Sequence, residues 1–157
     1  MLLRPYAGLN VYPASSWRNR FYPDVIAALK DAGHRPYDWK QSGFTWGGVA
    51  PIGLGPHPDY ISELRGGAAN LQFRRDINAI DNADVLVLIL PAGASAHAEL
   101  MHAHDKGKPT VIMLNEGFER DVMHAVADAF VEDIDGLLRC LSFVSINDQI
   151  EGLRMAP

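Results

Sequence analysis

The fold of this chain is decided by the stretch Ala83–Thr110, ADVLVLILPAGASAHAELMHAHDKGKPT. The stretch opens with an unbroken apolar run, Val85–Leu90, which is followed by a proline and a glycine. A helix-like segment comes next and stops at Lys106–Pro109, after which a second apolar run begins. An apolar run, a turn, a helix, a turn and another apolar run indicate a βαβ unit with fully buried parallel strands.

The same alternation extends through the rest of the chain. We expect further strands at Gly8–Tyr12 (ended by Pro13), His34–Tyr37 and Ala129–Val131. We expect helices at Trp17–Ala32, Ala69–Asn82, Phe118–Ala127 and from Asp133 or Asp135 to near Phe143, with one helical turn at Tyr60–Arg65. This pattern predicts a single α/β domain over residues 1–157, with a doubly wound, five-stranded parallel sheet in the order 2-1-3-4-5 and helices on both faces.

Two segments fall outside this pattern. Residues 40–59 carry several glycines and prolines together with aromatic residues, which favours a lid or pocket wall over a disordered loop. Ser145–Pro157 shows no clear period, so we expect a tail or a contact with another subunit there.

Composition limits the classes of function. The chain has 157 residues, 48% hydrophobic and 21% charged, with a formal net charge of -5 and no dense run of Lys or Arg. These values are ordinary for a globular domain and argue against a nucleic-acid polymer as partner. The single cysteine, Cys140, favours a reducing compartment. We find no signal peptide and no apolar run near the ~20 residues of a membrane helix, so we expect a cytoplasmic protein with no membrane partner.

The predicted strand order places a crevice where the first and third strands lie side by side. Ligands of such sheets bind at this switch point, so the turns Pro13–Trp17 and Pro91–Glu99 should face one crevice. If Ser95 caps the helix, Glu99 falls in its first turn, where the helix dipole favours an ionised carboxylate. The alternative is a solvated glutamate with no role in chemistry.

Two aspartates, Asp76 and Asp84, are candidate partners of this glutamate. Asp76 lies within a predicted helix and can lean into the crevice, where a second carboxylate raises one of the two pKa values. Its alternative role is an exposed ion pair with Arg74 or Arg75. Asp84 begins the third strand, at the edge opposite the crevice, so we expect a structural role for it.

Several other site types are disfavoured. His97, His102 and His104 contain no HExxH motif and no i, i+4 pair, so we expect no metal site. The chain lacks a GxSxG elbow, a GxGxxG motif and a P-loop, so we expect no cofactor.

Four motifs resemble, in order, those of the nucleoside 2-deoxyribosyltransferase family and related nucleotide N-glycosidases. They are Val11–Trp17 (VYPASSW), His57–Tyr60 (HPDY), Asp76-xxx-Ile80-xxx-Asp84, and Ser95–Leu100 (SAHAEL) followed by Ala103 and Gly107-Lys108. The resemblance implies cleavage of an N-glycosidic bond in a nucleoside or nucleotide, with transfer of the (deoxy)ribosyl group to another base or to water. It also implies a homo-oligomer.

The resemblance implies roles for particular residues. Glu99 matches the nucleophile, Asp76 the residue that assists the leaving base, Tyr12 the tyrosine that orients the glutamate, and Trp17 an aromatic residue of the base pocket. Cleavage through an oxocarbenium-like state fits a nearby carboxylate, and aromatic rings can stack on a base.

Other substrate-binding candidates surround the same crevice. Asp38 and Trp39 follow the second strand and would line the base pocket. Ser15, Ser16, Gly93 and Ser95 lie in the two turns, where hydroxyl groups and a helix N-terminus could hold a 5′-phosphate. Helix capping is the alternative role of the serines.

The chain departs from the family pattern at three places. The turn Ala92–Ser95 lacks the aspartate that transferases often carry before the glutamate, Met101 replaces a usual glycine, and the C-terminal segment does not match. The alternative hypothesis is therefore a non-catalytic nucleotide-binding or regulatory module of the same fold. A receiver-like phosphoacceptor shares the strand order but would need acidic residues where this chain has Ser15, Ser16 and Pro91.

Overall fold

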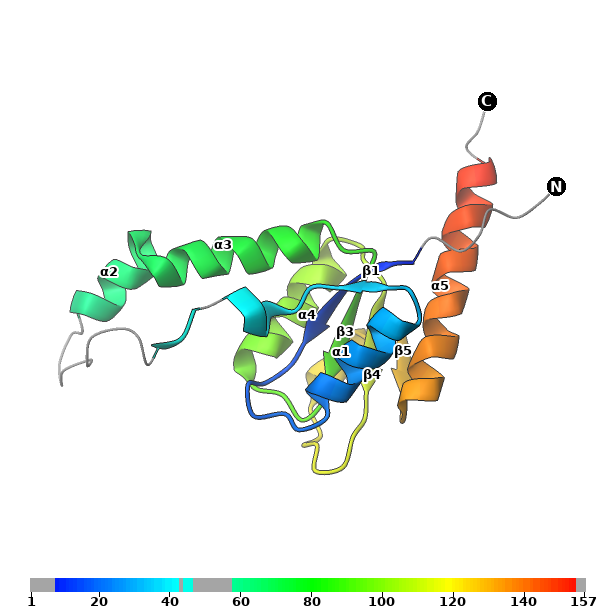
Figure 1. The fold of residues 1–157 in the computed structure, drawn as a ribbon, viewed down its shortest axis with the longest axis horizontal. Coiled ribbons are helices and arrows are strands. Elements are labelled where there is room, and N and C mark those ends of the chain that lie inside the picture. The colour runs from blue at the N-terminus through cyan, green and yellow to red at the C-terminus, as the bar shows by residue number, and fades with distance from the viewer. Residues whose placement is uncertain (1–7, 43, 47–57, 155–157) are drawn as a thin grey trace.

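The computed structural model describes residues 8–42, 44–46 and 58–154. Five parallel strands form one sheet in the order β2-β1-β3-β4-β5, which confirms the predicted fold (Figure 1). In chain order the elements are β1 Asn10–Ala14, α1 Tyr22–Asp31, β2 Arg35–Pro36, the 3-10 helix η1 Trp39–Ser42, α2 Pro58–Gly66, α3 Ala68–Asp81, β3 Val85–Ile89, α4 Ala94–Asp105, β4 Thr110–Met113, the 3-10 helix η3 Val122–Val126, β5 Ala129–Val131 and α5 Ile134–Arg154.

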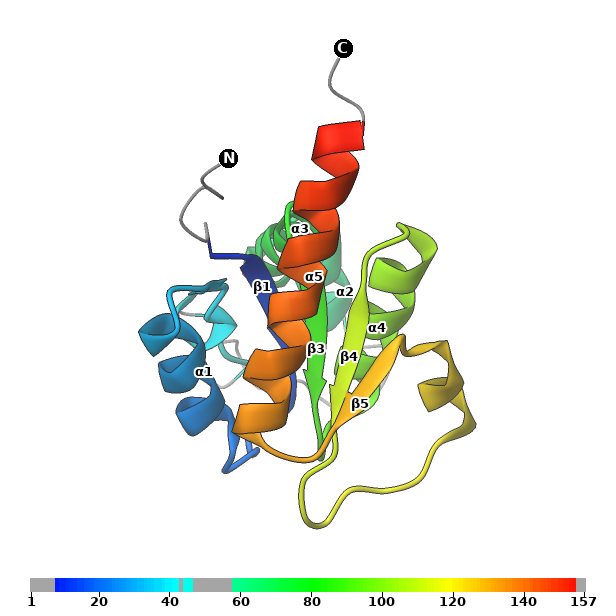
Figure 2. The same ribbon diagram turned by 90° about the vertical axis from the view of Figure 1, so that its right-hand side faces the viewer.

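Helices cover both faces of the sheet. Figure 2 shows α1 and α5 on the face turned toward the viewer, with α3 and α4 behind the strands. The start of α3 and all of α2 extend beyond the sheet as an arm, visible in green in Figure 1. None of the helices, over the residues described, is long and apolar enough to cross a membrane.

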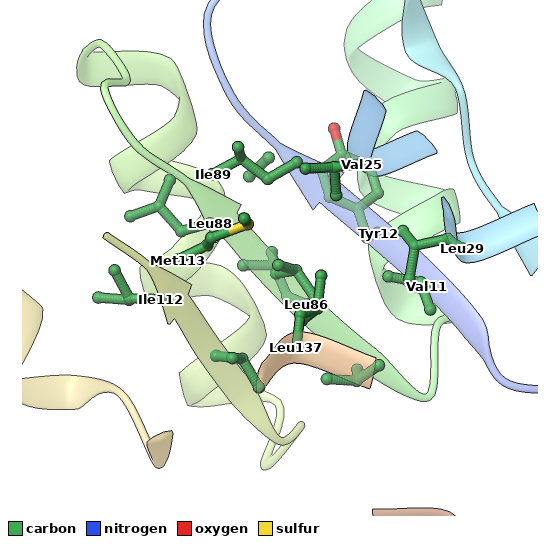
Figure 3. Close-up of a cluster of buried hydrophobic side chains, with 14 of the residues drawn as sticks. Val11, Tyr12, Val25, Leu29, Leu86, Leu88, Ile89, Ile112, Met113 and Leu137 are labelled. Atoms are coloured by element: carbon green, nitrogen blue, oxygen red, sulfur yellow. The ribbon is translucent and has the colours of Figure 1, made fainter. Parts of the chain in front are cut away.

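The core lies along β3, the central strand. All five residues of β3 are buried, because β1 and β4 pair with its two edges and helices cover both faces. Figure 3 shows side chains of β1, β3 and β4 meeting Val25 and Leu29 of α1 and Leu137 of α5. This packing explains why the strand sequence VLVLI is apolar without alternation.

The first strand differs from its prediction, because Pro13 lies inside β1 instead of ending it. β2 pairs with β1 only at Asn10 and Val11, so no strand partner is opposite the missing N–H of Pro13. The carbonyl oxygen of Pro13 points the same way and accepts a hydrogen bond from Nε1 of Trp39 at 2.7 Å. The Trp39 side chain thus supplies the hydrogen bond that β2 is too short to give at this position of β1.

Three helices also differ from prediction. α1 begins at Tyr22 rather than Trp17, because Asn19 folds the preceding turn back onto the third strand: its Nδ2 donates to the carbonyls of Ile89 and Pro91 at 2.9 and 3.0 Å. The helix expected at Phe118–Ala127 is only the 3-10 helix η3, capped by Asp121. α5 does not end near Phe143 but continues to Arg154, so most of the expected tail is helical.

The remaining predictions concern the loop and the start of β3. α2 is longer than the single turn expected at Tyr60–Arg65, and most of the predicted lid at 40–59 lies outside the described residues. Asp84 has the structural role expected of it, since its Oδ2 accepts the backbone N–H of Asn10 at 2.7 Å.

Candidate active site

Glu99 lies on α4, which begins two residues earlier than a Ser95 cap would require. Gly93 is the N-cap, Ser95 is exposed inside the first turn, and Glu99 falls in the second turn. The expected first-turn position is therefore wrong. Ala96, Leu100 and Ala103 are fully buried. Because two of these side chains are small, α4 packs closely on the sheet and brings Glu99 toward β1.

The Glu99 carboxylate meets Tyr12 from the middle of β1. The Tyr12 hydroxyl donates to Oε1 of Glu99 at 2.9 Å, and the Tyr12 side chain is fully buried. Burial raises the pKa of Tyr12 far above its ordinary value, so the hydroxyl keeps its proton and acts as a donor. The contact joins residues 87 positions apart, across the switch point between β1 and β3.

Burial also determines the charge of Glu99. Loss of solvation raises the pKa of Glu99 to about 7, the Tyr12 hydrogen bond lowers it, and the charge of Asp76 raises it. The expectation that the helix dipole keeps this carboxylate ionised is therefore wrong, because the group lies one turn deeper and is desolvated. Near neutral pH, Glu99 exchanges between its acid and its carboxylate.

Asp76 leans toward this glutamate from α3. Its Oδ1 accepts hydrogen bonds from the Tyr37 hydroxyl at 3.2 Å and from Nε2 of Gln72 at 2.7 Å. Burial raises the pKa of Asp76, and the two donors act against that rise. Within the described part of the chain Asp76 forms no ion pair, so the alternative of pairing with Arg74 or Arg75 is not observed.

Sequence reasoning missed Tyr37, Gln72 and a histidine pair. The Tyr37 ring stacks on Tyr12 with centroids 5.6 Å apart and planes 18° apart, which links the supports of the two carboxylates. Gln72 could have been found from its i, i+4 spacing to Asp76 on a helix. Tyr37 follows the short strand β2 and carries no sequence signal for this contact.

The proposed base-pocket residues lie together beside the end of β1. Trp17 is 54% exposed and meets the buried Trp39 edge to face at 5.1 Å. Asp38 accepts hydrogen bonds from the Tyr22 hydroxyl and from Nε2 of Gln41, both at 3.1 Å. Trp17 is therefore the aromatic residue of this group with an open surface, while Trp39 and Asp38 support the wall behind it.

The serines of the two turns have different environments. Ser15 donates to the carbonyl oxygen of Ile89 at 2.8 Å, which ties the turn after β1 to the end of β3. Ser16 accepts a hydrogen bond from the backbone N–H of Arg18 at 3.3 Å. Ser95 is exposed on the first turn of α4.

An open pocket of about 770 Å³ lies at the N-terminal end of α4. Ser16 and Gly93, both predicted to bind substrate, contribute to its wall, whereas Glu99, Tyr12 and Asp76 do not. The full lining is Ser16, Arg18, Asn19, Leu90, Pro91, Ala92, Gly93, Ala94, His97, Gly117, Glu119, Arg120 and Asp121. Two arginines, a serine and the start of a helix thus border one cavity, together with Glu119 and Asp121.

His97 on the pocket wall pairs with the buried His124 of η3. Their Nε2 atoms are 3.0 Å apart, and Nδ1 of His97 lies 2.8 Å from the carbonyl oxygen of Gly93. The ring planes are 17° apart and the centroids 5.2 Å apart, so the two rings meet through their Nε2 atoms. No group of three metal-ligating side chains occurs among the described residues.

The raised pKa of Glu99 predicts a pH-dependent effect of Glu99→Gln on stability. Between the ordinary pKa of 4.5 and the folded pKa of about 7, the folded state binds the extra proton, so wild-type stability falls as pH rises through this window. The amide of the Glu99→Gln variant does not ionise, so its stability has no such dependence on pH. The free energy of unfolding of the variant, relative to wild type, should rise by about 3 kcal/mol from pH 4.5 to pH 8 in urea titrations.

Asp105→Asn, an exposed carboxylate on the same helix, is the matched control. A Glu99→Gln difference that stays flat across this pH range, as in the control, would show that Glu99 is not desolvated.

Comparison with known proteins agrees with the fold. No protein-family model and no curated protein matches the sequence. A 2-deoxyribosyltransferase from Bacillus psychrosaccharolyticus superposes with a TM-score of 0.57 at 17% identity, over 82% of this chain and 89% of that one. A conserved protein from Enterococcus faecalis V583 gives 0.54 at 12% identity, over 84% and 96% of the two chains.

The CMP N-glycosidase of Clostridium botulinum gives a TM-score of 0.48 at 16% identity, over 84% of this chain and 97% of that one. The chain therefore has the fold of the 2-deoxyribosyltransferase from B. psychrosaccharolyticus, in agreement with the resemblance that its sequence motifs indicate.

Proposed function

We propose that this protein cleaves the N-glycosidic bond of a nucleoside or nucleotide and transfers the (deoxy)ribosyl group to another base or to water. The observation that supports this most directly is the partly buried Glu99 carboxylate, held by the Tyr12 hydroxyl at 2.9 Å and close enough to Asp76 for its charge to raise the pKa of Glu99. Its position beside the carboxyl ends of β1 and β3 is where such sheets bind ligands.

In the proposed reaction, ionised Glu99 attacks the anomeric carbon with one oxygen while the bond to the base breaks. The bonding electron pair leaves with the base, which takes a proton from protonated Asp76. The product is a glycosyl ester of Glu99. Water or a second base then attacks the same carbon, loses a proton to the ionised Asp76 and displaces the Glu99 carboxylate, whose charge Tyr12 stabilises in both steps.

Two further features support this function. The fold is shared with a 2-deoxyribosyltransferase. Trp17 offers a half-exposed aromatic surface beside Trp39, on which a planar base could stack. Asp38 and Trp39 form the support of this surface.

We also propose that the substrate carries a 5′-phosphate. Gly93 caps α4 without a side-chain hydrogen bond, so backbone N–H groups of the first turn open onto the pocket that Ser16, Arg18 and Arg120 border. Glu99 lies six residues after Gly93, about 9 Å along the helix axis, a separation comparable with the length of a sugar phosphate. Ser95 and Ser15 flank this end, Ser15 through its bond to Ile89.

The second candidate is a nucleotide-binding or regulatory module without turnover. The observation that favours it is the turn Ala92–Ser95, which contains no carboxylate, so Glu99 and Asp76 would have to act without a third acidic group. The two candidates differ in whether base is released.

Glu99→Gln should abolish release of free base, measured by chromatography over a panel of nucleosides and 5′-monophosphates. The rate should fall at least about a thousand-fold, because the amide cannot form the ester, while substrate binding measured by calorimetry is retained. In the wild type the rate should change with pH near 7, where Glu99 exchanges its proton.

Tyr12→Phe tests the same reaction with a smaller change at the site, the loss of one hydrogen bond. The Tyr12 hydrogen bond lowers the pKa of Glu99, so its loss should move this pH dependence of the rate to higher pH. Binding without base release across the whole panel in the wild type would favour the module instead.

Arg18→Gln should raise KM for a 5′-monophosphate about ten-fold or more and leave KM for the matching nucleoside unchanged, because only the phosphate loses a charged partner. Arg20→Gln is the control, since Arg20 lies in the same turn but pairs with Glu116 at 2.7 Å and does not border the pocket. Equal effects on both substrates would count against a phosphate in this pocket.

We further propose that the protein forms a homo-oligomer in the cytoplasm, the latter on the basis of its single cysteine. The arm formed by α2 and α3 exposes a group of large apolar side chains, each 39–61% exposed: Tyr60, Ile61, Leu64, Leu71 and Phe73. Such a group is unusual on a monomer and typical of a contact with another chain.

Phe73→Asp should therefore shift sedimentation velocity profiles toward the monomer. Phe143→Asp makes the same change at a residue of similar exposure on α5, 67% against 61%, and should leave the profile unchanged. A wild type that sediments as a monomer at high concentration would contradict this assembly.

A further inference from the structure

We infer that Tyr37 and Gln72 are positioning residues for Asp76, which hold one of its carboxylate oxygens and leave the other free to meet the leaving base. This inference rests on the proposed function, because it assigns the orientation of a group that acts there.

The two donors converge on the same atom. The Tyr37 hydroxyl and Nε2 of Gln72 both donate to Oδ1 of Asp76, at 3.2 and 2.7 Å. No hydrogen bond reaches Oδ2 from the residues that the structure describes. Since Tyr37 follows β2 and Gln72 is one turn earlier on α3, the carboxylate is held from two elements and cannot rotate without losing both bonds.

The amide of Gln72 shows that this arrangement is specific. Its Oε1 is buried and has no hydrogen-bond partner in the part of the chain described. An unpaired buried acceptor costs free energy, so a compensating interaction must hold the amide in this orientation. The compensation is the bond from Nε2 to the Asp76 carboxylate, which is strengthened by the negative charge of its acceptor.

Tyr37 connects Asp76 to Glu99. Its ring stacks on Tyr12 at 5.6 Å, and each of the two tyrosines donates to one oxygen of one carboxylate. The charged and titratable groups around Asp76 are therefore Tyr12 of β1, Glu99 of α4 and Tyr37, with Arg75 of α3 acting on Tyr37. The stack fixes the spacing of the two carboxylates.

Both donors also stabilise the charged form of Asp76. Burial raises the pKa of Asp76, and the hydrogen bonds from Gln72 and Tyr37 lower it. Loss of either donor should therefore raise this pKa further and let the carboxylate rotate.

The experiment compares Gln72→Met, Tyr37→Phe and the double variant in the full-length protein. Carbon-13 NMR follows the titration of the Asp76 carboxyl, with Asp76→Asn used to assign its signal. The pKa of Asp76 should rise in each single variant and rise most in the double variant. The value of kcat for base release should fall about ten-fold in each single variant with little change in KM.

Stability separates positioning from a structural role. Gln72→Met removes the unpaired buried oxygen while nearly keeping the side-chain volume, so its urea midpoint should equal or exceed that of the wild type. Tyr37→Phe keeps the stack on Tyr12. Asn78→Leu, a similar exchange at an exposed amide of the same helix, should change neither kcat nor the Asp76 titration.

An unchanged Asp76 titration in both folded single variants would overturn this inference. A loss of kcat that only follows a loss of stability would also overturn it. The titration requires no turnover, so it is independent of the proposed function, which is overturned separately if Glu99→Gln still releases base at the wild-type rate.

Discussion

The hydrogen bond between the Tyr12 hydroxyl and Glu99 is the contact on which the rest of the site depends. It requires that β1 lie beside β3, because Tyr12 belongs to β1 and α4, which carries Glu99, follows β3. It requires close packing of α4, which the buried alanines 96 and 103 allow. It also keeps a donor on a carboxylate that burial would otherwise leave without compensation. The parallel pairing of β1 with β3 and the small residues of α4 thus place the Glu99 carboxylate beside Tyr12.

A second carboxylate beside the first has a physical consequence. The charge of Asp76 opposes ionisation of Glu99 and adds to the rise in pKa that burial causes. The structure limits this cost by giving each carboxylate a tyrosine donor and by stacking the two rings. Asp84, only eight residues from Asp76, lies at the other end of the sheet and caps the start of β1. Position relative to the strands, and not distance in sequence, separates a candidate catalytic aspartate from a structural one.

The sequence predicted those features that depend on apolar periodicity and strand order. The run Val85–Leu90 identified the central strand, and the order 2-1-3-4-5 brought Tyr12 and Glu99 within hydrogen-bonding distance. Features set by individual side-chain contacts were not predictable. Pro13 lies within β1 because β2 is too short to need its N–H, and Ser95 lost the cap position to Gly93. Tyr37 and His124 acquire partners only through tertiary packing, so no local pattern marks them.

Helix α4 holds Glu99 at a fixed distance from the pocket, because the helix is rigid. Its first turn borders the open cavity, and Glu99 follows in the second turn, so the two sites have a fixed separation along one axis. In the proposed reaction, an anion bound at the N-terminal end would set the height of the anomeric carbon beside Glu99 without a moving part. The head-on pair of His97 and His124 joins this first turn to η3, and the bond from His97 to the Gly93 carbonyl keeps the cap in place. Substrate recognition and bond cleavage would then depend on the same helix, and a change that tilts α4 would weaken both together.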